Sequence, residues 1–123
     1  MAATKVGNSA GARAATRANE VRLIGRLSGE PIARLLPSGD EITTWRLVVE
    51  RAGGGRTSAD DRRVPTVDTI DCVAYRPSVR RGAERWAPSE ILEVEGALRR
   101  RFWRGPHGAA SRYEVEVIQA RKA

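Results

Sequence analysis

Residue types that carry covalent or metal chemistry are scarce in this 123-residue chain, which has one Cys and one His. Cys72 alone cannot form an intramolecular disulfide, and Cys72 with His107 cannot supply the ligands of a zinc site. No nucleophile, base and orienting acid can be assembled from the other side chains. We therefore expect no enzyme, no bound metal and no cofactor.

Long apolar runs are missing as well. No run approaches the roughly 20 residues that cross a bilayer, and the first residues lack the apolar segment of a secretory signal. The single cysteine is typical of a protein in a reducing compartment. We expect a cytoplasmic protein with no membrane partner.

Positive charge, in contrast, is in excess: 22 Lys and Arg residues outnumber 15 Asp and Glu residues, which gives a net charge of +7. This balance favours polyanionic partners, nucleic acid first among them. Residues 1–19 hold three basic residues, no acid and few large apolar side chains. They cannot bury enough surface to offset the entropy lost on ordering. We predict a disordered basic arm over 1–19 and one folded domain over 20–121.

The hydrophobic pattern of that domain predicts five strands, at 20–27 (resuming at 33–36 after a break or bulge over 28–32), 41–51, 67–75, 90–104 and 111–119. Turns are expected at 37–40 and 105–108, and a long polar loop at 52–66. The one helix is predicted over 77–86, with Pro77 at its start and Pro88 beyond its end. Five strands with one short helix between the third and fourth are the layout of the OB-fold, an all-β, five-stranded Greek-key barrel.

Candidate binding residues lie at 94–103, which reads VEGALRRRFW. Alternation along a strand places Arg99, Arg101 and Trp103 on one face. Guanidinium groups can meet phosphates, and an indole ring offers a stacking surface to any base. A basic surface strand whose tryptophan closes the core would have the same pattern. The side chains expected in the core are Trp45, Cys72 and Trp86.

Four segments together resemble the bacterial single-stranded DNA-binding protein family. They are 19–27 (NEVRLIGRL), 37–39 (PSG), 68–76 (DTIDCVAYR) and 94–99 (VEGALR). In this order they extend the resemblance from residue 19 to about residue 120. It implies an OB-fold that usually assembles as a homotetramer and wraps single-stranded DNA without strong sequence preference.

The resemblance also implies which residues bind. Trp103 matches the family's stacking tryptophan at the end of the fourth strand, and Tyr75 takes the place of a stacking Phe or Trp on the third strand. The basic candidates are Arg99 and Arg101 beside that tryptophan, Arg34 after the first-strand bend, and Arg51 at the mouth of the long loop.

The chain departs from the family pattern at several positions. Thr69 stands where an aromatic residue is common, and Glu20 and Asp71 place negative charge where a basic side chain would help. The sequence ends in RKA rather than in a tail with an acidic tip. We therefore expect lower affinity per nucleotide and no recruitment of proteins through an acidic tail.

These observations predict a homo-oligomeric protein, a tetramer or a dimer, that coats single-stranded DNA on the nucleoid during replication, recombination or repair. Two alternatives remain open from the sequence. One is a primosome-type or RNA-binding OB-fold module that uses the same surface. The other is an assembly subunit whose barrel mainly binds a protein partner.

Overall fold

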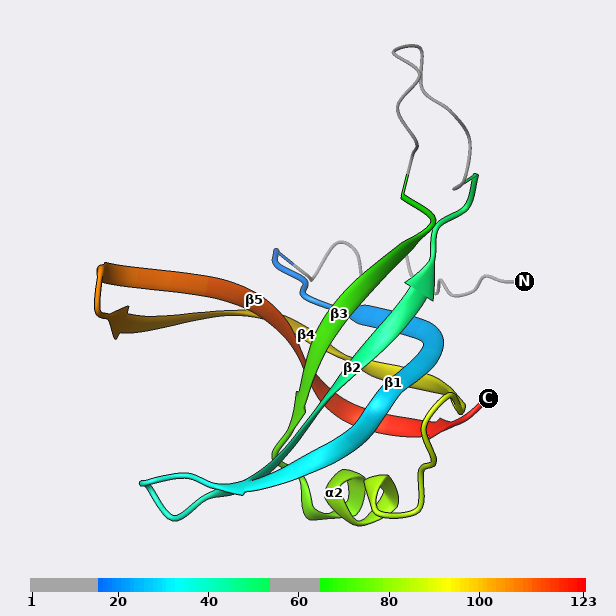
Figure 1. Cartoon of the computed structure of the whole chain (residues 1–123), viewed down its shortest axis with the longest axis horizontal. Helices are drawn as coiled ribbons and strands as arrows, with labels where there is room; N and C mark the ends of the chain where they lie inside the picture. Colours follow the sequence, from blue (N-terminus) through cyan, green and yellow to red (C-terminus); the bar gives the residue numbers. More distant parts are fainter. Residues whose placement is uncertain (1–15, 54–64) are drawn as a thin grey trace.

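The computed structural model describes residues 16–53 and 65–123, which form one closed barrel of five strands (Figure 1). The strands are β1 (Val21–Leu35), β2 (Glu41–Glu50), β3 (Val67–Ala74), β4 (Ile91–Gly105) and β5 (Gly108–Lys122), with α2 (Pro77–Ala83) between β3 and β4. Their order around the barrel is β1-β2-β3-β5-β4. The barrel and the place of the helix confirm the predicted OB-fold. Within the described ranges, no helix is long and apolar enough to span a membrane.

The barrel closes because β1 is shared between two neighbours. Its first half pairs with β4, from Val21↔Gly96 onward, and its second half pairs with β2, ending at Leu35↔Glu41. The register shifts between Ser28 and Ile32, where Gly29 has a φ of +78°. The sequence predicted a break or a bulge over 28–32, and the structure shows a bulge in one long strand. A short parallel contact between β3 and β5 completes the circle.

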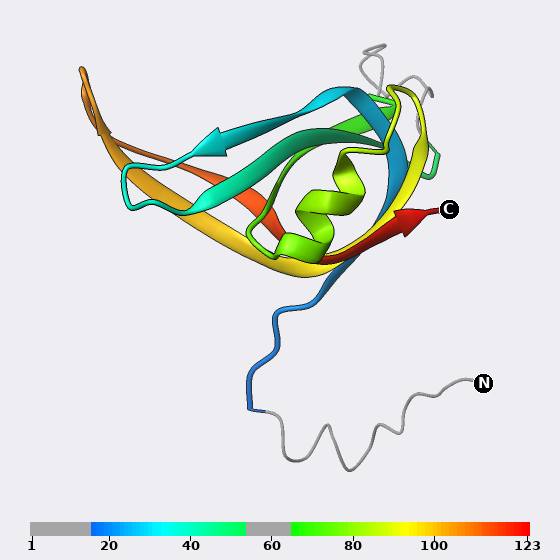
Figure 2. The same cartoon turned by 90° about the horizontal axis from the view of Figure 1, so that it is seen from below.

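The core fills the barrel and is capped at one end by α2 (Figure 2). Trp45 and Trp86 meet there edge to face, with ring centroids 5.0 Å apart, and Cys72 is also buried. The predicted core positions of these three residues are confirmed. Helix α2 faces the core with Val79 and Ala83.

The predicted helix was three residues too long, because α2 ends at Ala83 instead of at residue 86. The N–H group of Trp86 donates to the carbonyl of Ala83, three residues back, rather than to the one four residues back. The chain therefore tightens after the last helical turn. Trp86 reaches the core from this turn.

Two hairpins extend beyond the closed part of the barrel, as Figures 1 and 2 show. One is the end of β1 with the start of β2, joined by a turn in which Gly39 has a φ of +95°. The other is the ribbon of β4 and β5, paired as far as Gly105↔Gly108. Strand β5 begins three residues earlier than predicted, because Gly108, with a φ of +107°, makes the connection tight.

Candidate nucleic-acid interface

A groove of about 660 Å³ lies between the two hairpins, beside β3. Its basic side chains are Arg34 from β1, Arg46 from β2, Arg101 from β4 and Arg112 from β5. Its acidic side chains are Glu30 from β1, Asp71 from β3 and Glu114 from β5. Four arginines and three carboxylates therefore line one hollow, so the groove is close to electrically balanced.

Trp103 is the exposed tryptophan of this groove. Its side chain is 48% exposed, although Trp45 and Trp86 are buried. The guanidinium carbon of Arg112 lies 5.9 Å from the centroid of the Trp103 ring. A cation held against an aromatic face leaves a flat, positively charged platform on which a base and its phosphate can both be accommodated.

Ion pairs hold two of the groove's arginines. Nη1 of Arg101 lies 3.2 Å from Oε2 of Glu114, and Nε of Arg46 lies 3.3 Å from Oδ1 of Asp71. Within the described ranges, Arg34 has no hydrogen-bonding or ionic partner. Its charge is therefore available to a ligand without breaking a contact in the protein.

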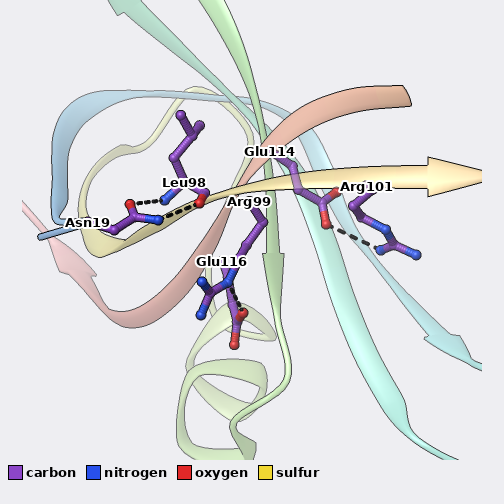
Figure 3. A network of polar contacts seen from close by, with 6 residues as sticks. All are labelled: Asn19, Leu98, Arg99, Arg101, Glu114 and Glu116. Carbon is purple, nitrogen blue, oxygen red and sulfur yellow. Dashed lines mark hydrogen bonds and ion pairs between the residues drawn. The ribbon is translucent and has the colours of Figure 1, made fainter. Parts of the chain in front are cut away.

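Three of the six residues predicted as binding residues, Arg34, Arg101 and Trp103, are brought together in the groove. Arg99 lies on the same face of β4 but is hydrogen-bonded to Glu116 at 2.9 Å, outside the groove (Figure 3). Tyr75 lies just past the end of β3. It is exposed, and its backbone carbonyl accepts a hydrogen bond from Arg80.

Arg51 is the third predicted residue outside the groove. It follows β2 and makes two hydrogen bonds to one carboxylate oxygen of Asp68 and one to the other, at 2.8–3.1 Å. This contact raises the pKa of Arg51 and lowers the pKa of Asp68 from their ordinary values. Most of the loop that Arg51 opens, 54–64, lies outside the described residues.

Sequence reasoning missed Arg46 and Arg112 as residues of the groove. For Arg112 the signal was available, because a tight turn at 105–108 pairs Arg101 with Arg112 across the ribbon. Residues directly opposite each other on antiparallel strands share a face. Arg112 therefore had to lie on the face of Arg101 and Trp103. No comparable signal identified Arg46, because its place depends on how the two hairpins lie against each other.

Asn19 anchors the start of the folded domain to β4. Its side-chain Nδ2 donates to the carbonyl of Leu98, and its Oδ1 accepts from the N–H of Leu98, both at 2.8 Å (Figure 3). Asn19 and Leu98 stand two residues beyond Val21↔Gly96 in the same register. The side-chain amide of Asn19 therefore makes the two hydrogen bonds that a backbone N–H and carbonyl would make in a strand. Residues 1–15 of the predicted arm lie outside the described residues, and the arm stays a prediction.

A closed five-stranded barrel with a groove between two hairpins defines an OB-fold binding module. The chain belongs to the single-strand binding protein family, which it matches over residues 18–122. It is 31% identical over 100 residues to the single-stranded DNA-binding protein of Bacillus cereus, a match that covers 81% of this chain and 55% of that protein. It is 28% identical over 102 residues to single-stranded DNA-binding protein A of Bacillus subtilis, with 83% and 55% covered. The chain thus spans about half the length of these curated relatives.

Solved structures show the same fold at low sequence identity. The Plasmodium falciparum SSB complex with ssDNA aligns with a TM-score of 0.68 at 19% identity, over 87% of this chain and 94% of that chain. The small single-stranded DNA-binding protein from Streptomyces coelicolor aligns with a TM-score of 0.60 at 14% identity, over 85% and 93%.

Proposed function

We propose that this protein binds single-stranded DNA in the groove between its two hairpins, with little sequence preference. The observation that carries the proposal is the half-exposed Trp103 ring, with Arg112 against it and Arg34 and Arg101 in the same groove. Stacking on Trp103 accepts any base, and the arginines meet phosphates. Membership of the single-strand binding protein family supports the same ligand.

Tryptophan fluorescence tests this proposal directly, because Trp45 and Trp86 are buried and Trp103 is not. Titration with oligo-dT should quench the emission to a plateau, and the quenching should weaken as salt is raised. Trp103→Ala should remove most of the quenching. It should also lower the affinity by roughly fivefold to 150-fold, the equivalent of about 1–3 kcal/mol for one stacked base.

Trp103→Phe is the matched control, with affinity measured by the anisotropy of a labelled oligonucleotide. It keeps an aromatic ring and should keep most of the affinity, although it loses the fluorescence signal. Wild-type affinity in Trp103→Ala would contradict the proposed site. A competition with RNA of equal length then shows whether DNA is the preferred strand.

The proposal includes assembly with further copies into a homo-oligomer, either a dimer or a tetramer, that coats DNA on the nucleoid in the cytoplasm. Exposed apolar side chains on the outer surface of the barrel support assembly: Ile24, Ile91 and Ile118 are each more than 40% exposed. Sedimentation equilibrium over a range of protein concentrations measures the assembly. A monomer at every concentration would contradict this part of the proposal.

A further inference from the structure

The β4–β5 ribbon has a second face, opposite Trp103, that also carries an arginine and two aromatic residues. Arg100 is paired with Tyr113 and Phe102 with Ser111, so these four side chains share one face. We call it the reverse face. Phe102 is 71% exposed and Tyr113 is 57% exposed, so both rings are open to a ligand.

Arg100 lies across this face in a fixed position. Its guanidinium carbon is 5.0 Å from the centroid of the Phe102 ring and 5.4 Å from that of Tyr113. Its Nε and Nη2 atoms donate to Oγ of Ser111 at 3.3 and 3.1 Å. No carboxylate within the described ranges pairs with it. A guanidinium held in this way can present a flat surface to a base and N–H groups to a phosphate.

The charge of the ribbon identifies the kind of ligand. Residues 99–112 contain five arginines and no Asp or Glu. A second copy of the chain that docked here through the same face would bring one set of arginines against another, which is unfavourable. A polyanion with flat, stackable groups fits both features of the face, its charge and its rings.

We propose that the reverse face binds a second segment of the same DNA strand, which passes from the groove around the ribbon. This inference rests on the proposed function of the groove. Phe102 makes the path continuous, because it borders the groove and its ring also contacts Arg100. The ribbon is only two strands wide beyond the barrel (Figure 1), so a flexible strand can contact both faces.

The length of the oligonucleotide separates the two faces. We choose oligo-dT of about 8 nucleotides, which fits one OB-fold, and oligo-dT about three times longer. The double variant Arg100→Ala/Tyr113→Ala changes two residues outside the groove, so it should bind the short oligonucleotide like the wild type and the long one roughly tenfold more weakly. Trp103→Ala should weaken both. Leu35→Ala is the control, because Leu35 is an exposed side chain on the other hairpin and lies outside the groove.

Photo-crosslinking with 5-iodo-deoxyuridine in the long oligonucleotide gives a direct readout on the unmodified protein. Trypsin releases Tyr113 in the peptide 113–121 and Trp103 in the peptide 102–104, so a crosslink at Tyr113 is resolved by mass from one at Trp103. We expect a crosslink at Tyr113 with the long oligonucleotide and none with the short one.

The outcomes distinguish failure of this inference from failure of the proposed function. If wild-type protein binds neither oligonucleotide, the proposed function fails and the inference fails with it. If it binds both, but the double variant matches Leu35→Ala and Tyr113 is not crosslinked, only the reverse-face site is overturned. A double variant with unchanged DNA affinity and an altered oligomeric state in sedimentation would also overturn it, in favour of an interface between copies.

Discussion

Arg101 and Glu114 form an ion pair across the β4–β5 ribbon, 3.2 Å apart, and Glu114 is the one charged side chain in the described part of the chain that is buried, at 5% exposure. Both residues line the groove. A phosphate that approaches Arg101 therefore competes with a carboxylate already in place. Because Arg101 and Arg46 are already paired with carboxylates, fewer than four of the groove's arginines are free to meet a phosphate.

Replacing Glu114 with Gln should strengthen DNA binding, because the amide keeps the shape and an acceptor oxygen but removes the competing charge. We expect affinity to rise several-fold at low salt, and the plot of log affinity against log salt to steepen by about 0.7, the value for one further phosphate contact on a single strand. Fluorescence or anisotropy titrations at four salt concentrations measure both quantities.

Glu116→Gln is the control for this variant, since Glu116 pairs with Arg99 outside the groove. It should change affinity and salt dependence much less. Weaker binding by Glu114→Gln would show that the carboxylate orients Arg101 for the phosphate instead of competing with it.

Arg34 and Arg51, both predicted from the sequence as binding residues, should differ in a direct comparison. Arg34 lines the groove, whereas Arg51 is held by Asp68 at 2.8 Å outside it. Arg34→Ala should weaken binding and reduce the salt slope by about 0.7, the effect of one lost phosphate contact. Arg51→Ala should leave both nearly unchanged. Equal losses in the two variants would show that the strand extends along the mouth of the long loop.

Gly96 should be far more sensitive to substitution than Gly82. A Cβ atom at Gly96 would lie 1.9 Å from the carbonyl oxygen of Glu116, where the register of β4 and β5 shifts. Gly96→Ala should lower the free energy of unfolding by about 3 kcal/mol, the upper range for overpacking. Gly82→Ala, with no atom within 4 Å of the new Cβ, should stabilise α2 by about 0.5–1 kcal/mol. Urea denaturation followed by circular dichroism measures both, and equal stability of the two variants would contradict the close approach.

Cys72 should make the protein less stable in alkali. Burial, with a smaller contribution from Asp71 and Glu114, raises the pKa of the Cys72 thiol from 9.0 to about 12. Between these values the unfolded chain releases a proton that the folded chain retains, so stability falls as pH rises above 9. From pH 8 to pH 10 the wild type should lose about 1.4 kcal/mol more than Cys72→Ala.

Urea denaturation of the two proteins at both pH values gives this difference, and changes in other titrating groups cancel in the comparison. The native thiol should also react slowly with iodoacetamide at pH 8 and rapidly in urea. Parallel pH dependence in the two proteins would show that the Cys72 thiol ionises at the same pH in the folded chain as in the unfolded chain.

The order of the elements could be predicted from the sequence because each depends on local chemistry. Alternation of apolar residues indicated the strands, Pro77 the start of the helix, and Gly39 and Gly108 the turns. The inward positions of Trp45 and Cys72 followed from the same alternation. The errors are confined to the ends of elements, such as the helix that stops at Ala83, because an end depends on which hydrogen bonds the surroundings allow.

The composition of the groove was decided by the tertiary structure. The sequence by itself determined that Arg99, Arg101 and Trp103 share a face, because a strand has a period of two. Only the fold placed Arg34 and Arg46 opposite Arg101 and Trp103 in one groove, and left Arg99, Tyr75 and Arg51 outside it. It also paired Arg101 with Glu114, thirteen residues away, across the ribbon. The sequence gives the number of arginines. Packing decides which carboxylate each arginine contacts, and therefore how many arginines are free to bind a phosphate.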